Sequence, residues 1–206
     1  MSGQDARIDE VRGTSNSWIL GDDEEVIVID PGTDAQAVLE VVGDRAILAV
    51  ICTHGHAGHC DAALEVAERD EAPIALHPAD RREWRDVHDN QPDIDMEDGG
   101  QFEVAGVTLE VLHAPGHSRG SVCLYCEELE AVFTGDVISD TGPVPRDDGY
   151  PNWGRQLDAI GAQVLTLPPQ TRILPGHGDE FTVAVAEKRF DGWVAAGQTG
   201  FEPDAD

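Results

Sequence analysis

The stretch that decides the fold runs from Ala46 to Cys52 (AILAVIC) and continues directly into Thr53 to His59 (THGHAGH). A short apolar run that ends in a glycine turn is typical of a buried strand. The turn holds three histidines within six positions, and imidazole is the commonest protein ligand for zinc and also suits iron. Gly55 and Gly58 let the backbone fold tightly enough for the rings to converge. The sequence therefore predicts a metal-binding loop at the end of a buried strand.

Further downstream, two histidines and an aspartate lie in similar surroundings. They are His117 in APGH, Asp136 in FTGD and His177 in LPGHG. Each follows a β-rich stretch that ends in a glycine turn, so a rigid sheet can hold its side chain in place. A solvated turn is the usual fate of a single histidine, but it fits this repeated pattern poorly. We expect these residues to join the histidine loop.

The charge balance excludes several classes of partner. Thirteen Lys and Arg stand against 41 Asp and Glu, the formal net charge is -28, and Lys188 is the only lysine. Nucleic-acid binding depends on clustered Lys and Arg, and anionic membranes also attract cations, so we expect neither partner. The acidic, lysine-poor composition resembles that of proteins from salt-accumulating halophiles. The alternative is an ordinary acidic protein.

The apolar runs are too short for a membrane anchor. The longest, Ala46 to Cys52, is far below the ~20 residues that a span requires. Residues 1–10 are polar and acidic and contain no apolar targeting core, so we expect a cytoplasmic protein. Four cysteines are too few for a disulfide framework, and we expect core thiols at Cys52, Cys60, Cys123 and Cys126.

Apolar periodicity and turn residues divide the chain into alternating strands and helices, then a run of strands. The expected strands are 17–20, 25–30, 46–52, 73–77, 101–104, 107–113, 121–126, 131–138 and 171–174. The expected helices are 34–42, 61–69, 152–165 and 181–191. Residues 86–100 indicate a polar connector, 140–154 a long loop, and 201–206 a disordered acidic tail. We expect one α/β domain over residues 1–206, a four-layer αβ/βα sandwich with the histidine loops along one edge.

With these motifs in place, the chain resembles the metallo-beta-lactamase fold superfamily, in its glyoxalase II-like (hydroxyacylglutathione hydrolase-like) branch. The histidines of the family's His-x-His-x-Asp-His motif are matched by His54, His56 and His59, and its other motifs fall between residues 30 and 178. The resemblance implies a first metal ion on His54, His56 and His117, a second on His59 and His177, Asp136 bridging both, and Asp30 supporting the metal loop.

The chain departs from the family at one position, where Gly58 replaces the motif's aspartate. Glycine supplies no ligand atom, so the resemblance implies one tightly held zinc ion and a weakened second site, with iron as an alternative metal. Asp61 begins a helix three residues further on. It is a poor substitute, because ligand geometry tolerates little displacement.

The expected function is a metal-dependent hydrolase, with Asp136, His54, His56 and His117 as the catalytic set. Metal-bound hydroxide would attack a small-molecule acyl thioester or a similar activated acyl compound. A thiolate leaves with a pKa of about 8.5 and needs little acid help, whereas an alkoxide needs a proton donor.

Substrate contacts are less constrained by the sequence. Arg155 is the candidate for binding a substrate carboxylate, and an ion pair with the acidic surface is the alternative reading. His77 and His113 end strands on the same edge, and they either line the pocket or make structural hydrogen bonds. The sequence does not determine the oligomeric state.

Two other functions remain open. Persulfide dioxygenases share the resemblance and are similar to mononuclear iron enzymes, and His54, His117 and Asp136 match a two-histidine, one-carboxylate triad that does not involve position 58. The other alternative is a non-catalytic metal-binding relative, which the retained His59 and His177 disfavour.

Overall fold

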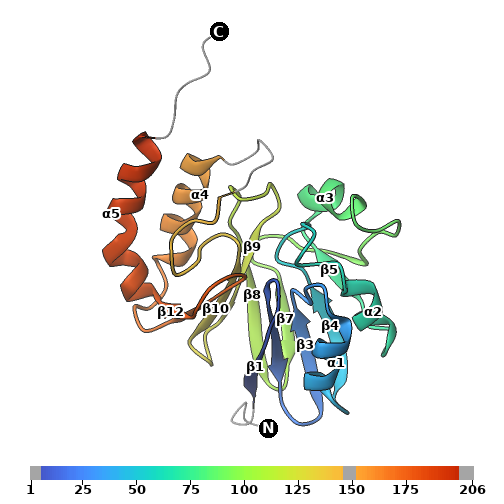
Figure 1. The fold of residues 1–206 in the computed structure, drawn as a ribbon. Coiled ribbons are helices and arrows are strands. Elements are labelled where there is room, and N and C mark those ends of the chain that lie inside the picture. The colour runs from blue at the N-terminus through green and yellow to red at the C-terminus, as the bar shows by residue number, and fades with distance from the viewer. Residues whose placement is uncertain (1–5, 146–151, 200–206) are drawn as a thin grey trace.

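The computed structural model describes residues 6–145 and 152–199, and its strands form two six-stranded sheets that face each other (Figure 1). The first sheet contains, in spatial order, β1 (Arg7–Arg12), β2 (Asn16–Gly21), β3 (Glu25–Ile29), β4 (Ala46–Ile51), β5 (Ile74–Leu76) and β6 (Ile94–Asp95). The second contains β12 (Phe181–Thr182), β11 (Arg172–Pro175), β10 (Ala131–Gly135), β9 (Val122–Cys126), β8 (Val107–His113) and β7 (Gln101–Val104). Both sheets mix parallel and antiparallel pairs.

Helices cover the outer face of each sheet (Figure 1). The first sheet carries α1 (Ala35–Val42), α2 (Ala63–Glu68), the 3-10 turn η1 (Pro78–Asp80) and α3 (Arg81–Arg85). The second carries α4 (Trp153–Ala159), the π-helical turn η2 (Ile160–Val164) and α5 (Val183–Thr199). The expected four-layer αβ/βα sandwich is confirmed.

Three apolar layers separate the four layers of secondary structure. The central layer lies between the sheets, where Phe133 is fully buried and meets Trp18 edge-on with ring centroids 6.1 Å apart. The two outer layers lie beneath the helices. The four expected core thiols are confirmed, because every cysteine is free and buried. Close packing of this kind makes the sheets rigid supports for the loops at their edge.

Local signals set the first helix as the sequence predicts. The Asp34 carboxylate accepts a hydrogen bond from the Ala37 N–H at 3.0 Å, which caps the start of α1. Gly43, at φ +62°, ends the helix and donates its N–H to the Leu39 carbonyl.

Three segments differ from the sequence-based expectation. Residues 7–12 form the edge strand β1, which the sequence analysis did not predict. An edge strand buries few side chains, so its sequence is mostly polar; within this strand only Ile8 and Val11 pack against the core. Two short helical elements, η1 and α3, precede the expected connector 86–100, and the short strand β6 lies within it. The fully buried Trp84 anchors α3. A single anchor gives no periodicity to detect.

The expected helix 181–191 was wrong at both ends, because residues 181–182 pair with β11 as β12 and the helix then continues to Thr199. The expected tail at 201–206 and part of the long loop, residues 146–151, lie outside the described residues. Within the described ranges, no helix is both long and apolar enough to cross a bilayer.

Candidate metal centre

Five strands end at the same edge of the sandwich, and each is followed by a candidate site residue. Strands β3 and β4 are parallel, and Asp30 and the histidine loop follow them. In the other sheet, β10 is parallel to β11 and antiparallel to β9, which is antiparallel to β8. The ends of β8, β10 and β11 therefore point the same way, and they deliver His117, Asp136 and His177.

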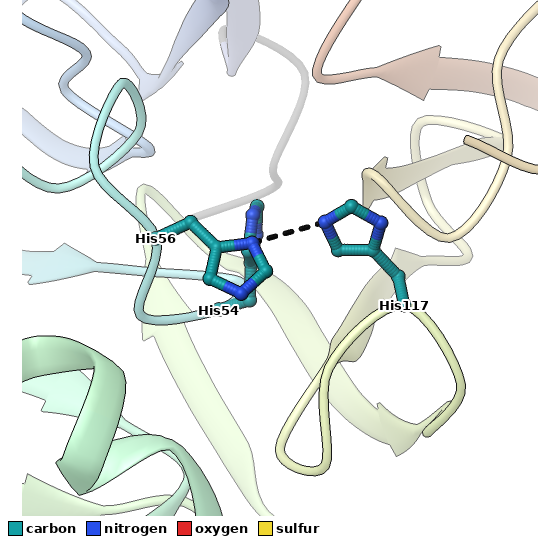
Figure 2. Close-up of side chains that lie close together, drawn as sticks. All are labelled: His54, His56 and His117. Atoms are coloured by element: carbon teal, nitrogen blue, oxygen red, sulfur yellow. Dashed lines mark hydrogen bonds between the residues drawn. The ribbon is translucent and has the colours of Figure 1, made fainter. Parts of the chain in front are cut away.

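The side chains from these loops gather into three overlapping groups of ligand atoms; one joins Asp30 to His54 and His59, and the other two together contain the six candidate ligands. In one of these two groups, the atoms of His54, His56 and His117 lie within 4.8 Å of one another. Figure 2 shows the rings of this group, with His56 Nδ1 3.0 Å from His117 Nε2. The other group, under the same limit, consists of His59, Asp136 and His177. Residues up to 123 positions apart in the sequence thus meet in one cluster.

Asp136 lies between the two groups. Its Oδ2 atom is 3.3 Å from His59 Nε2 and 3.5 Å from His117 Nε2. The same oxygen lies 3.9 Å from His54 Nε2, and the Oδ1 atom lies 3.5 Å from His177 Nε2. One carboxylate therefore faces four imidazole rings, the position expected for a group that bridges two ions.

A hydrogen bond and an ion-pair contact outside the cluster orient two of the rings. The Nδ1–H of His117 donates to the Val144 carbonyl at 3.1 Å, so its Nε2 lone pair faces the cluster. His59 Nδ1 lies 3.5 Å from Asp30 Oδ2, which directs its Nε2 toward Asp136. Metal-binding histidines in proteins are held in this way, with the second ring nitrogen donated to an oxygen.

The cluster passes a test of fit for a divalent cation. Within the described residues, the buried atoms His54 Nε2 and Asp136 Oδ1 have no hydrogen-bond partner. A buried polar atom left without a partner costs about 1–3 kcal/mol, and a cation would satisfy both lone pairs. Imidazole nitrogens with one carboxylate are a donor set suited to zinc or iron.

Burial and the Asp136 charge set the protonation of the cluster. Burial and the neighbouring His59 hold the pKa of His54 well below its usual value, so the ring is neutral and can offer a lone pair. Burial also opposes a charge on His59, but Asp136 and Asp30 together outweigh it and raise the pKa of His59 to about 10. Burial raises the pKa of Asp136, yet His59 and His177 more than offset this and hold it well below normal. The carboxylate is therefore anionic.

Asp30 anchors the start of the histidine loop. Its two carboxylate oxygens accept hydrogen bonds from the N–H and the hydroxyl of Thr53, both at 2.7 Å. Asp30 is 1% exposed and adopts φ +48°, a left-handed conformation that is uncommon outside glycine. Asp30 thus ties the end of β3 to the start of the histidine loop.

Position 58 has no carboxylate substitute in the described structure. The exposed Asp61 carboxylate accepts a hydrogen bond from the Gly58 N–H and belongs to neither ligand group. Its bond to the backbone stabilises the turn. Asp61 thus supports the loop without entering the cluster.

Arg155, the expected substrate contact, is exposed in the first turn of α4, where its backbone N–H donates to the Asn152 side chain.

The rings of His77 and His113 stack with their centroids 4.2 Å apart. The Ala79 N–H donates to His77 Nδ1, and His113 Nε2 donates to the Arg119 carbonyl. Structural hydrogen bonding of this pair, one of the two readings from sequence, is thus observed.

Sequence reasoning missed the buried Gln156. Its Nε2 group lies 3.2 Å from the carbonyl of Asp136, 2.9 Å from that of Val137 and 3.3 Å from that of Val144, the acceptor of His117. A polar residue on an otherwise ordinary helix carries no signal of this role.

The cluster opens toward solvent on one side. The His177 side chain is 42% exposed, whereas the Asp136 side chain is 7% exposed.

Known proteins share this architecture and sequence pattern. Residues 11–177 match the sequence profile of the Metallo-beta-lactamase superfamily. Probable metallo-hydrolase YqgX of Bacillus subtilis is 30% identical over 184 residues, covering 82% of this chain and 87% of the relative. Hydroxyacylglutathione hydrolase GloC of Haemophilus influenzae is 26% identical over 189 residues, covering 84% and 89%.

Two solved structures are similar over 88% of this chain and 97% of their own. The BLEG-1 B3 metallo-beta-lactamase has a TM-score of 0.82 and 25% identity. TTHA1623 in a di-iron-bound form has a TM-score of 0.72 and 27% identity. The profile match spans most of the chain, and the chain therefore belongs to the metallo-beta-lactamase superfamily.

Proposed function

We propose that this protein is a divalent-metal-dependent hydrolase that cleaves a thioester or a similar activated acyl compound. The observation that carries the proposal is the pair of ligand groups that meet at Asp136 beside the exposed His177. Superfamily membership supports hydrolysis, and the similarity to proteins named metallo-hydrolase and hydroxyacylglutathione hydrolase supports an acyl thioester substrate.

In this proposal the two ligand groups bind two ions of unequal affinity. His54, His56 and His117 would hold the first ion, His59 and His177 would hold the second, and Asp136 would contribute to both sites. Zinc is the proposed metal and iron is the alternative. A divalent ion bound by these residues would supply a Lewis acid, which would lower the pKa of bound water from 15.7 to about 7 and would polarise an acyl carbonyl.

The chain's own groups then hold the reacting atoms in place. Asp136 stays anionic near neutral pH because its pKa is held low, so it keeps its place between the two ligand groups. The Val144 carbonyl fixes the orientation of the His117 ring. Arg155 is the proposed contact for a substrate carboxylate, and its exposure leaves the guanidinium accessible.

A thioester suits these residues better than an ester or a lactone. A thiolate leaves with a pKa of about 8.5, so it departs without a proton donor. An alkoxide is far more basic and needs a nearby acid. Gly58 supplies none, and the Asp61 carboxylate is engaged with the Gly58 N–H.

The function is tested by metal analysis and two assays on protein purified in high salt. We expect bound zinc and release of thiol from S-acyl thiols, because the site combines several imidazoles, among them the neutral His54, with an anionic carboxylate. Chelation should abolish thiol release, and zinc added back should restore it. Metal binding without turnover of any acyl thiol would instead support a non-catalytic relative.

One observation favours an iron oxidoreductase as a second candidate. The Nε2 atoms of His54 and His117 lie 3.9 Å and 3.5 Å from Asp136 Oδ2. These residues form a set of two histidines and one carboxylate that does not depend on position 58. Iron in the purified protein, with oxygen uptake on addition of a persulfide and no thiol release, would favour this candidate over the hydrolase.

Replacing Gly58 by aspartate is expected to strengthen the second site. A Cβ at Gly58 would meet no atom within 4 Å, so the side chain has room. Dialysed Gly58→Asp protein should retain two ions per chain where the wild type retains one. Because Gly58 adopts φ +93°, the substitution should also cost about 1–3 kcal/mol of stability.

Gly58→Ala is the matched control for that variant. It introduces the same backbone strain without a ligand atom, so its metal content should equal that of the wild type. Two tightly held ions in the wild type would contradict the prediction, because they would show that glycine does not weaken the second site.

A further inference from the structure

A third buried carboxylate, Asp80, lies behind the metal cluster at the end of η1. It is fully buried and accepts three hydrogen bonds. The Asp80 Oδ2 atom accepts from the Gly55 N–H at 3.1 Å and from the Ser118 hydroxyl at 2.5 Å. The Oδ1 atom accepts from the Gly120 N–H at 2.6 Å. A buried charge with this many donors is well compensated.

The donors to Asp80 come from the two loops that carry the first ligand group. Gly55 lies between His54 and His56 on the loop after β4. Ser118 directly follows His117 on the loop after β8, which belongs to the other sheet. One carboxylate therefore joins, across the two sheets, the backbone segments that hold all three rings.

The contact between Asp80 and these loops is tight. A Cβ on Gly55 would lie 2.7 Å from the Asp80 carbonyl oxygen, and a Cβ on Gly120 would lie 2.8 Å from the Asp80 side chain. Both distances are shorter than real Cβ contacts. The two glycines thus allow the loops to approach Asp80 as closely as the backbone can, and a shift of Asp80 must shift the loops.

The Ser118 side of this arrangement is extended by one more residue. The Ser121 hydroxyl lies 2.6 Å from the Ser118 hydroxyl and accepts a hydrogen bond from the Ser118 N–H at 3.0 Å. Ser118 is therefore held at both its backbone and its side chain. The position of His117 follows from that of Ser118 because the two are neighbours in the chain.

We propose that Asp80 is a positioning residue that sets the spacing between the His54 and His56 rings and the His117 ring, and thereby the affinity and geometry of the first metal site. It touches no ligand ring in this role and acts through Gly55, Ser118 and Gly120. Metal sites tolerate displacements of only about 0.2 Å in ligand distance, so a small change in loop spacing alters binding. The inference rests on the proposed function only in requiring that the first site binds an ion.

The test compares Asp80→Asn with the wild type as full-length, metal-loaded protein. Asparagine keeps the size of the side chain, but its NH2 group would face an N–H or hydroxyl donor instead of accepting from it. We expect the zinc dissociation constant to rise about 10- to 100-fold, as for other residues that support metal ligands. With Co²⁺ in place of zinc, the visible absorption spectrum should change, because it reports the ligand geometry.

Ser118→Ala is the second variant, and it decides the question if Asp80→Asn does not fold. It removes one donor and leaves both backbone donors in place, so it should weaken zinc binding in the same direction by a smaller factor. Its Co²⁺ spectrum should shift toward that of Asp80→Asn.

Arg45→Met is the control for general destabilisation. Arg45 is buried just before the start of β4, at the end of the strand away from the histidine loop. Its guanidinium donates hydrogen bonds to the Asp9 carboxylate and the Val42 carbonyl. This variant should lower the melting temperature and leave zinc affinity and the Co²⁺ spectrum unchanged.

Variants of Asp80 and Ser118 that unfold more easily but bind zinc as tightly as Arg45→Met would overturn the inference and leave the proposed function intact. A wild-type chain that binds no divalent ion would overturn both.

Discussion

Asp136→Asn is expected to lower affinity for divalent metal by more than about 100-fold and to abolish hydrolysis. Loss of a residue that only supports a metal ligand already costs 10- to 100-fold in affinity, and Asp136 faces the rings of both ligand groups directly. Asparagine is isosteric, so the fold should persist. Metal content after dialysis and a competitive zinc titration measure the effect.

Asp158→Asn is the matched control, since it makes the same chemical change at an exposed position on α4. It should leave metal content and activity unaltered. If the Asp136→Asn protein keeps its ions through dialysis, Asp136 is not a metal ligand and does not bridge the two groups.

The melting temperature is expected to rise steeply with KCl, by about 10 °C or more between dilute buffer and about 1 M salt. The formal net charge of -28 places many carboxylates close together on a small surface. The Debye length falls to about 3 Å at 1 M salt, so their mutual repulsion is screened. At 2–4 °C per kcal/mol for a chain of this size, the shift corresponds to several kcal/mol.

Sucrose at matched osmolality separates screening from preferential exclusion, which also stabilises compact states. Sucrose should give a smaller rise than KCl. A melting temperature that stays flat from dilute buffer to molar KCl would contradict the halophile-type interpretation and favour an ordinary acidic protein.

The fold could be predicted where the signals are local. The apolar run before the histidine loop, the Asp34 cap and the Gly43 stop each determine their own segment, and the structure places β4 and α1 there. By contrast, β1 is polar because it lies at a sheet edge, and α3 depends on the single buried Trp84. Such elements owe their structure to tertiary contacts, which sequence periodicity does not record.

The candidate site, like the fold, could be predicted only where the sequence signal is local. The glycine turns around the six candidate ligands gave a recognisable pattern, and the structure gathers all six. Apart from Asp30, which the family resemblance indicated, the residues that hold them gave no such pattern. Asp80 is 25 positions from Gly55 and 38 from Ser118, and Gln156 is 20 positions from Asp136. These partners become neighbours only through tertiary contacts, and Asp80 meets Ser118 only when the two sheets face each other.

Position 58 shows a further limit of sequence reasoning. The sequence shows that glycine replaces a carboxylate, but it does not say where the next carboxylate points. The structure shows that Asp61 binds the Gly58 backbone and stays outside the ligand groups. The expectation of a weak second site therefore stands as a prediction with a structural reason.

The central claim is that the imidazoles of both sheets hold a common cation next to Asp136. A crystal structure of the zinc-loaded protein with anomalous scattering data at the zinc edge tests it most directly. The account predicts a peak about 2.0–2.1 Å from ring nitrogens of His54, His56 and His117. A strong peak elsewhere on the acidic surface, with none among these three rings, would contradict it.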